Sequence, residues 1–310
     1  LKAGVKVRII YDGVGSWSLR RSFIKNIRAA GIEIFPFMPV SLGPLANKIN
    51  YRNHRKIVVV DGLVGFTGGI NISDKYLSGD PVLGSWRDTH LRLEGAAVSS
   101  LNQIFINDWN FVSHQNIELP TIPSFTSGHT FVQIVASGPD QQFSSILQEY
   151  FSLITAADEY IYISTPYFIP CEAILLAMKT AALSGVEVIL LLPRQSDSAV
   201  LKYGIQSYLE ELLEAGVRIF LYQEGFLHSK VIVSDDAVAS VGTANVDERS
   251  FENNFEVNAL LYDQQVAHQL KHNFFEDLCQ SKEVYLDEFR KRSKRTRVLE
   301  SIARLLSPLL

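Results

Sequence analysis

Short apolar runs of strand length alternate along the chain with stretches whose apolar residues recur at helical spacing. Residues 130–136, 160–164 and 186–193 are such runs, rich in β-branched and aromatic side chains. Between the first two runs, apolar side chains fit one face of a helix at positions 143, 146, 147, 150 and 154, and residues 171–183 predict a second helix. Strands that alternate with helices are typical of an α/β fold built on a buried sheet.

The pattern occurs twice in the same order. The segment LKAGVKVRIIYD (1–12) matches LSGVEVILLLP (183–193), and AGIEIF (30–35) matches AGVRIF (215–220). Further along, NHRKIVVVDG from Asn53 matches LHSKVIVSDD from Leu227, and GGIN (68–71) matches GTAN (242–245). Four matched blocks in one order predict two structurally related halves. The fold class we expect is α/β, with two pseudo-symmetric α/β/α halves and an active site at their interface.

The repeat also predicts the domain boundaries. We place the first half at 1–112, a connection rich in Pro, Ser, Thr and Asn at 113–129, the second half at 130–282, and a C-terminal helix at 283–310. Only three residues precede Gly4, whereas its counterpart Gly185 follows a strand, a helix and a further strand. We therefore expect about one strand–helix–strand unit to be absent from the front of the first half, and we interpret the chain as a fragment.

Composition narrows the class of partner. The net charge of -4 and the pI near 6.0 argue against a general nucleic-acid binder, so we expect no nucleic-acid partner. Cys171 and Cys279 lie far apart without ligand spacing, which favours a reduced compartment and no disulfide framework. No apolar run reaches the ~18 residues that a membrane-spanning helix needs.

Each half contains the pattern H-x-K-x-x-x-x-D. Its members are His54, Lys56 and Asp61, and then His228, Lys230 and Asp235. The residues after each histidine are β-branched and predict a strand, on which side chains two apart point the same way. Histidine and lysine therefore share one face in each half. We group the two aspartates with the catalytic residues because they belong to the same motif. They lie an odd number of positions after the histidines, however, so we expect them to point away from the histidines and to act structurally.

A histidine beside a lysine suits a phosphodiester substrate. The imidazole can attack phosphorus and form a covalent intermediate, while the ammonium stabilises the non-bridging oxygens. Asn71 and Asn245 follow on the return strands, and we expect them to bind phosphate. Gly68, Gly69 and Gly242 would leave room for a phosphate beside the backbone.

Two histidines can divide the reaction between them. One must be neutral to attack, and the other must be protonated to release the leaving alkoxide. Each needs a group that fixes its tautomer, and we assign Asp88 and Glu256, which follow the two motifs at comparable places, as orienting carboxylates. Arg52 and Arg55 would depress the pKa of His54, whereas a carboxylate partner could keep His228 protonated against the effect of desolvation.

Each motif also allows a less specific interpretation. One H-x-K-x-x-x-x-D match is weak, but two copies in register, each with a trailing asparagine and carboxylate, favour a functional pair over a structural one. His268 and His272 have the i, i+4 spacing of a metal pair, yet they lack a third ligand and better fit a solvated helix face. We expect no metal and no cofactor.

The C-terminal segment combines cations with an amphipathic pattern. Six basic residues lie within 290–297, and apolar side chains follow at Val298, Ile302, Leu305 and Leu309. This pattern is typical of helices that lie on an anionic membrane surface. The alternatives are a helix docked on the body of the protein and a disordered tail.

The paired motifs resemble the phospholipase D superfamily. Four further stretches, NHRKIVVVDGLVGFTGGINISDKY, SWRDTHLRLEGAAV, LHSKVIV and VGTANVDERSFENNFEVN, resemble the bacterial cardiolipin synthases of that superfamily, and the resemblance spans roughly residues 1–277. It implies metal-free transfer of a phosphatidyl group between two phosphatidylglycerol molecules at the bacterial cell membrane, with the catalytic part on the cytoplasmic side. It also implies that His54 is the nucleophile and His228 the general acid and base. Phosphate would be bound by Lys56, Lys230, Asn71 and Asn245, and the histidines would be oriented by Asp88 and Glu256.

Two alternatives remain open at this point. One is a phospholipase-D-type hydrolase or nuclease, in which water is the acceptor. The other is a catalytically inactive membrane adaptor that retains the fold, against which the intact histidines and lysines of both motifs argue.

Overall fold

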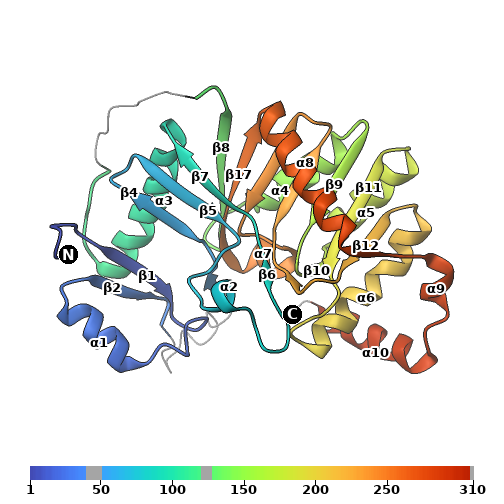
Figure 1. The fold of residues 1–310 in the computed structure, drawn as a ribbon, viewed down its shortest axis with the longest axis horizontal. Coiled ribbons are helices and arrows are strands. Elements are labelled where there is room, and N and C mark those ends of the chain that lie inside the picture. The colour runs from blue at the N-terminus through green and yellow to red at the C-terminus, as the bar shows by residue number, and fades with distance from the viewer. Residues whose placement is uncertain (40–50, 120–127, 308–310) are drawn as a thin grey trace.

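The computed structural model describes residues 1–39, 51–119 and 128–307. Figure 1 shows the two halves side by side, with the first half in blue to cyan and the second in green to orange. The two halves are α/β units built from the same order of elements, as the repeat predicts.

The second half is a complete layered unit. Its elements are β8 (Phe131–Ser137), α4 (Ser145–Thr155), β9 (Tyr160–Ser164), β10 (Phe168–Ile169), α5 (Glu172–Leu183), β11 (Glu187–Pro193), α6 (Ala199–Glu214), β12 (Arg218–Tyr222), β13 (Phe226–Leu227), β14 (Val231–Ser234), β15 (Val238–Gly242), β16 (Val246–Asp247), α7 (Glu248–Glu252), β17 (Asn254–Tyr262) and α8 (Gln264–Cys279). The strands predicted at 130–136 and 160–164 and the helix at 171–183 are confirmed as β8, β9 and α5.

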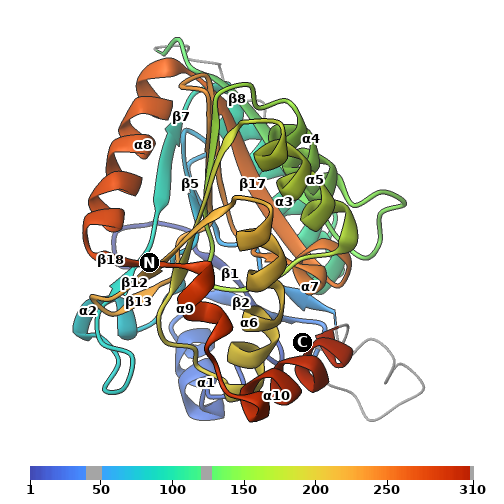
Figure 2. The same ribbon diagram turned by 90° about the vertical axis from the view of Figure 1, so that its right-hand side faces the viewer.

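The sheet of the second half is mixed and covered on both faces. Among the described residues its order is β12-β11-β9-β14-β15-β17, and β8 pairs with β17. The strands β9, β11 and β12 run parallel, because helices connect them, whereas β14 and β15 form an antiparallel hairpin. Figure 2 shows α8 on one face and α4 to α6 on the other. The apolar side chains of these helices form two buried clusters against the sheet.

The first half is more open. Its elements are β1 (Arg8–Asp12), α1 (Arg21–Ala29), β2 (Glu33–Phe37), β3 (Arg52–Asn53), β4 (Ile57–Val60), β5 (Val64–Gly68), α2 (Lys75–Ser78), β6 (Trp86–Arg87), β7 (His90–Glu94) and α3 (Ala96–Ser113). In the second half β9 lies between β11 and β14, but in the described part of the first half no strand joins β1 to β4. Val58 and Val60 on β4 are consequently 47% and 48% exposed, whereas all of β14 is buried.

Two short strands cross between the halves. β3 of the first half pairs in parallel with the start of β17, so that Asn53 lies beside Phe255. In the mirror arrangement, β13 of the second half pairs in parallel with β6, so that Leu227 lies beside Arg87. We call β3 and β13 the exchanged strands. They join the two halves, and each is directly followed by a histidine of the repeated motif.

The C-terminal segment returns to the second half. β18 (Ser281–Val284) adds antiparallel to β12, and α9 (Leu286–Arg290) and α10 (Lys294–Leu305) follow it. The strand spans the boundary predicted at 282 and 283, and α10 packs against α6. Among the described residues, no helix is both long and apolar enough to cross a bilayer.

Candidate active site at the junction of the halves

The exchanged strands determine where the two histidines lie. His54 directly follows β3, and its backbone N–H donates to the carbonyl of Phe255 at 2.9 Å. His228 directly follows β13, and its N–H donates to the carbonyl of Arg87 at 2.7 Å. Each histidine therefore stands next to the first residues of a strand in the other half.

Each histidine is held by the carboxylate of the opposite half. Nδ1 of His54 lies 2.9 Å from both carboxylate oxygens of Glu256, and Nδ1 of His228 lies 2.7 Å from Oδ2 of Asp88. The assigned orienting residues thus both meet a histidine, but across the junction. A carboxylate at Nδ1 favours the tautomer with the proton on that atom, which leaves Nε2 for chemistry; Nε2 of His228 lies 3.2 Å from Nζ of Lys230.

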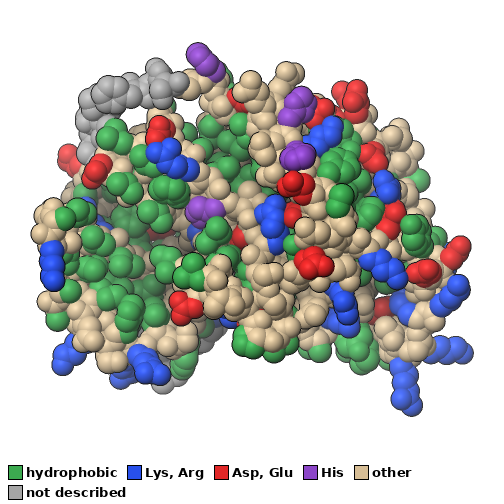
Figure 3. Space-filling view, viewed as in Figure 1, with side chains coloured by type: hydrophobic (Ala, Val, Ile, Leu, Met, Phe, Trp, Pro, Cys, Tyr) green, Lys and Arg blue, Asp and Glu red, His purple; other side chains and the backbone are tan. Residues whose placement is uncertain are grey.

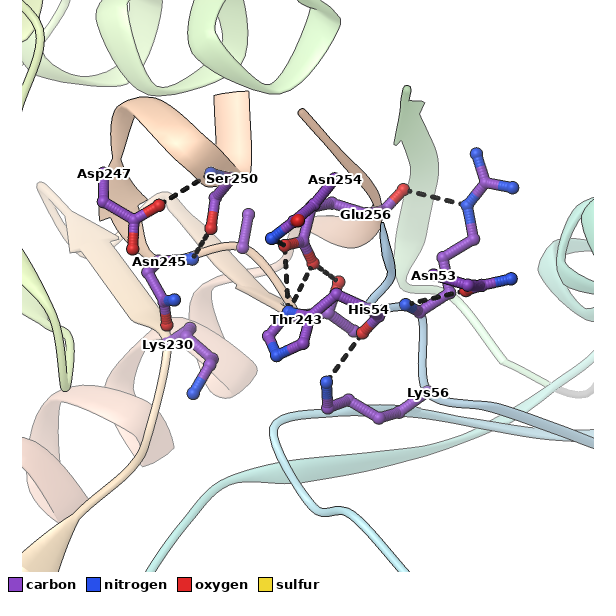
Figure 4. A network of polar contacts seen from close by, with 12 residues as sticks. Asn53, His54, Lys56, Lys230, Thr243, Asn245, Asp247, Ser250, Asn254 and Glu256 are labelled. Atoms are coloured by element: carbon purple, nitrogen blue, oxygen red, sulfur yellow. Dashed lines mark hydrogen bonds and ion pairs between the residues drawn. The ribbon is translucent and has the colours of Figure 1, made fainter. Parts of the chain in front are cut away.

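Glu256 is completely buried and is itself held in place. Thr243 donates to its Oε2, and the side-chain amide of Asn254 donates to its Oε1 at 3.1 Å. Burial opposes ionisation, yet the hydrogen bond from His54 and the ammonium of Lys56 keep the pKa of Glu256 below its usual value. Figure 4 shows this network around His54.

Asp88 has a different set of neighbours. The backbone N–H of Thr89 donates to its Oδ1 at 2.8 Å, and the hydroxyl of Tyr76 lies 3.0 Å from its Oδ2 and 3.0 Å from Nδ1 of His228. Despite burial, the hydrogen bond from His228 and the charge of Lys230 hold the pKa of Asp88 below its usual value. Trp86 packs on the imidazole of His228, with ring centroids 5.0 Å apart.

The lysines stand beside the histidines, as the strand pattern predicts. Nζ of Lys56 donates to the carbonyl of His54 at 2.7 Å, and Nζ of Lys230 donates to the carbonyl of His228 at 2.6 Å. Burial lowers the pKa of Lys56 to about 7 and that of Lys230 to about 8, against the pull of Glu256 and Asp88. Two ammonium groups close together, that of Lys230 buried and that of Lys56 half-buried, form a site suited to an anion.

The free site favours the neutral form of both histidines. Burial is the main cause that lowers the pKa of His54, and it lowers the pKa of His228 to about 3, aided by the charge of Lys230. The prediction that a carboxylate partner keeps His228 protonated is therefore wrong for the free protein, since desolvation outweighs Asp88. The lowered pKa predicted for His54 is confirmed, but its causes differ: burial, Lys56 and Lys230 lower it, whereas the Arg55 guanidinium is engaged by Asp108 at 2.8 Å.

The lysines also connect the two histidines electrostatically. Lys230 lowers the pKa of His54, and Lys56 lowers that of His228. Each lysine is thus close enough to influence the histidine of the other half. Figure 4 shows His54, Lys56 and Lys230 directed toward the same region.

The two asparagines differ in their surroundings. Asn245 is buried, its backbone N–H donates to Ser250, and its Oδ1 has no hydrogen-bond partner among the described residues. Asn71 is exposed at the end of the corresponding turn. Asn245 is thus a buried group with an unpartnered acceptor among the described residues, whereas Asn71 is open to solvent.

At Gly69 and Gly242 the space that a side chain would need is occupied by polar side chains of neighbouring residues. A Cβ at Gly69 would lie 2.0 Å from Oδ1 of Asp88, and one at Gly242 would lie 1.8 Å from Oδ1 of Asn258. The space above both glycines is filled, which corrects the expectation that it is kept for substrate. At Gly69 the missing side chain is what lets Asp88 come close to His228.

The aspartates of the two motifs lie at the far ends of their strands. Asp61 and Asp235 both occupy turns with φ of 52°. The carboxylate of Asp235 accepts from three backbone N–H groups at the start of β9, at 2.8–3.0 Å. It fixes the turn between β14 and β15 to β9, so the structure brings neither aspartate to the histidines.

Several groups around the histidines carry no motif of their own. Tyr76, Thr243 and Asn254 contact the orienting carboxylates, and Trp86 packs on His228. In the sequence, these residues are marked only by their position near the matched blocks of the repeat. Elsewhere, His268 and His272 are 60% and 70% exposed, and no group of metal-binding side chains occurs among the residues described here.

A double α/β unit with a histidine–lysine pair from each half is the phospholipase D type of architecture. The phosphatidylserine synthase of Haemophilus influenzae Rd KW20 has the same fold over 98% of this chain and 83% of its own, with a TM-score of 0.75 and 15% identity. At that identity the likeness concerns the fold alone.

The family follows from the sequence match. The model described as "Cardiolipin synthase, PLD-like domain" matches residues 1–109 and 150–278, and the chain belongs to this family. A cardiolipin synthase of Geobacillus kaustophilus is 50% identical over all of this chain, which covers 62% of that protein. The major cardiolipin synthase ClsA of Bacillus subtilis is 45% identical over all of this chain, which covers 65% of it. The chain thus spans a little under two thirds of these relatives.

Proposed function

We propose that this chain is the catalytic part of a cardiolipin synthase, which transfers a phosphatidyl group from one phosphatidylglycerol to another with release of glycerol. The observation that carries this proposal is the crossed pairing, in which Nδ1 of each histidine is held by a carboxylate of the other half. It leaves two Nε2 atoms and two lysines for one phosphodiester. The names of the relatives, at 45–50% identity, supply the choice of lipid.

In the first step, Nε2 of His54 attacks phosphorus of phosphatidylglycerol. The bond from phosphorus to the glycerol oxygen breaks, and that oxygen takes the proton from Nε2 of His228 as glycerol leaves. The product is a phosphatidyl-histidine. Lys56, Lys230 and Asn245 stabilise the charge on the non-bridging oxygens, with Asn71 at the open side.

The second step reverses these roles. The hydroxyl of a second phosphatidylglycerol gives its proton to His228, and its oxygen forms the new bond to phosphorus. The bond from phosphorus to Nε2 breaks, which releases cardiolipin and restores His54. No metal is required, because the lysines provide the positive charge and the histidines transfer the proton.

The proton on His228 would arrive with the substrate. In the free site the charges of Lys230 and Lys56 help to lower the pKa of His228 to about 3. A bound phosphodiester carries a negative charge that offsets both lysines, and this raises the pKa of the imidazole. General-acid action is thereby linked to occupancy of the site.

We further propose that the enzyme works at the bacterial cell membrane, since both of its substrates are membrane lipids. We also propose that this part lies on the cytoplasmic side. The protein should be incubated with phosphatidylglycerol in vesicles, with and without a chelator, and the products weighed by mass spectrometry. The proposal predicts cardiolipin and glycerol in equal amounts in both samples. Phosphatidic acid as the main product would make water the acceptor, and loss of turnover in chelator that one divalent ion restores would contradict the metal-free mechanism.

A further inference from the structure

The C-terminal helix α10 is docked with its polar side inward. Glu300 and Ala303 are both 3% exposed against the body, whereas Val298, Ile302 and Leu305 are 57%, 50% and 83% exposed. An amphipathic helix that only packs on a globular domain buries its apolar stripe instead. The sequence allowed three alternatives for this segment: a docked helix, a membrane helix and a disordered tail. The structure shows a docked helix whose apolar side faces outward.

Polar contacts to α6 hold the helix in this orientation. Arg292 lies between the carboxylates of Glu210 and Glu300, and the Arg304 guanidinium lies 2.7 Å from Glu211. Tyr208 of α6 also bonds Ser307 just beyond the helix, with 3.0 Å between their oxygens. The outward apolar side chains are therefore not needed to keep α10 in place.

Exposed cations flank the outward side of α10. Lys291, Lys294 and Arg295 are exposed, and none of them forms an ion pair with any residue that the structure describes. Glu300, the single acidic residue within 294–305, is turned inward to Arg292. We call this surface, made of Val298, Ile302, Leu305, Lys291, Lys294 and Arg295, the α10 face. Its charge is complementary to an anionic surface.

A second group of exposed apolar side chains lies near the candidate active site. Ile72, Leu77 and Val82, on and around α2, are 101%, 90% and 79% exposed. Tyr76 of the same short helix contacts His228. Figures 1 and 2 both show α1, α10 and the segment that follows α2 at the lower side of the molecule, and Figure 3 shows lysine and arginine side chains that project there near α9 and α10.

We propose that the α10 face and the apolar side chains of the α2 segment form one docking surface for an anionic lipid bilayer. The apolar side chains enter the headgroup boundary, and the cations bind the lipid phosphates above it. Docking in this way turns the junction of the halves toward the headgroups that carry the phosphodiester. The choice of a bilayer as the partner rests on the proposed function, but the surface itself is defined by exposure and charge.

The test compares two double variants in vesicle sedimentation. Ile302→Glu with Leu305→Glu places two charges on the α10 face, and Leu176→Glu with Leu183→Glu places the same charges at two exposed leucines of α5, on another side of the molecule. With phosphatidylglycerol vesicles, the α10 variant should lose binding by roughly tenfold and the α5 variant should bind like the unmodified chain. Binding of the unmodified chain should weaken as salt is raised and should be far lower on phosphatidylcholine vesicles.

Two results would overturn the proposal. One is equal loss, or no loss, of vesicle binding in the two variants. The other is an unmodified chain that is dimeric in solution and becomes monomeric only in the α10 variant, which would make a second copy the partner. Turnover of short-chain phosphatidylglycerol dissolved below its micelle concentration separates this proposal from the proposed function. It should be equal in both variants, and its absence from the unmodified chain would contradict the function while leaving the binding difference intact.

Discussion

The two halves carry the same motif in different surroundings. The side chain of His228 is 6% exposed, whereas that of His54 is 28% exposed. The strand after His228, β14, is buried along its length, but the strand after His54, β4, has two half-exposed valines. Each carboxylate partner also has its own support, hydroxyl and amide groups for Glu256 and Tyr76 for Asp88. The repeat therefore supplies two similar sets of groups, and the packing around them makes the sets unequal.

This inequality favours different roles for the two histidines. The more open His54 can be reached by a phosphodiester at Nε2 while Glu256 holds its ring from behind. The more buried His228 keeps its neutral form until an anion is bound, which suits a group that transfers a proton only during turnover.

The largest effect is expected when either imidazole is removed. His54→Ala and His228→Ala should each lower turnover by about 10⁴-fold or more, and the double variant should be no worse, because residues that act as one unit lose their effect together. Steady-state rates on phosphatidylglycerol vesicles test this. Near-normal activity in one single variant would mean that the halves do not share a site.

The carboxylates should separate the two roles. Asp88→Asn and Glu256→Gln should each lower turnover by about 10² to 10⁴-fold, because an amide no longer fixes the tautomer of the imidazole it faces. With a phosphatidyl nitrophenyl ester, whose leaving group needs no proton, the first-turnover release should recover in Asp88→Asn but not in Glu256→Gln. Asp61→Asn, in a turn far from the histidines, is the matched control. Recovery in Glu256→Gln alone would exchange the roles of the two histidines.

The lysines predict a pH dependence of substrate binding. A lysine is charged below its pKa, and burial lowers that of Lys56 to about 7. The KM for phosphatidylglycerol should therefore rise by roughly tenfold between about pH 6 and 9 as this charge is lost. Lys56→Arg keeps this charge throughout, so its KM should stay nearly constant to about pH 7 and rise only as Lys230, with a pKa of about 8, loses its charge. An equal slope in both proteins from pH 6 onward would contradict this role of Lys56.

Of the four sets of substitutions, the change at Tyr76 should have the smallest effect on the reaction. Tyr76→Phe removes a hydroxyl that contacts both Asp88 and His228, which should slow turnover by about three- to tenfold. The loss should disappear with the nitrophenyl ester, because only proton transfer is affected. Tyr262→Phe removes a hydroxyl that contacts Gln133 at the far end of β17 and serves as control. Equal losses in the two variants would show a general effect on stability.

Much of this site could be predicted from the sequence, because a repeat makes weak signals reinforce each other. The offset shared by His54 and His228, and by Asn71 and Asn245, identified the pairs, and strand periodicity put each lysine on the same face as its histidine. The crossed pairing could not be found in this way. It depends on β3 and β13, two-residue strands that pair with the opposite half and have no periodicity of their own.

The pKa values were also beyond the sequence. Neighbours along the chain suggested that arginines act on His54 and that a carboxylate keeps His228 charged, but burial decides both. Burial depends on contacts made across the junction, where Trp86 and Tyr76 of the first half pack against His228. The side chain of His228 is consequently 6% exposed, against 28% for that of His54. The support from Tyr76 was missed for the same reason, since α2 meets His228 only across the junction.

The central claim is that one site uses two histidines with His54 as the nucleophile. Rapid acid quench of the protein with phosphatidylglycerol labelled in its phosphate, followed by peptide mapping, tests it most directly. The account predicts label on the peptide that contains His54 and none on the peptide that contains His228. Label on the His228 peptide would contradict the assignment of roles, and cardiolipin formation without label on either peptide would contradict the covalent mechanism itself.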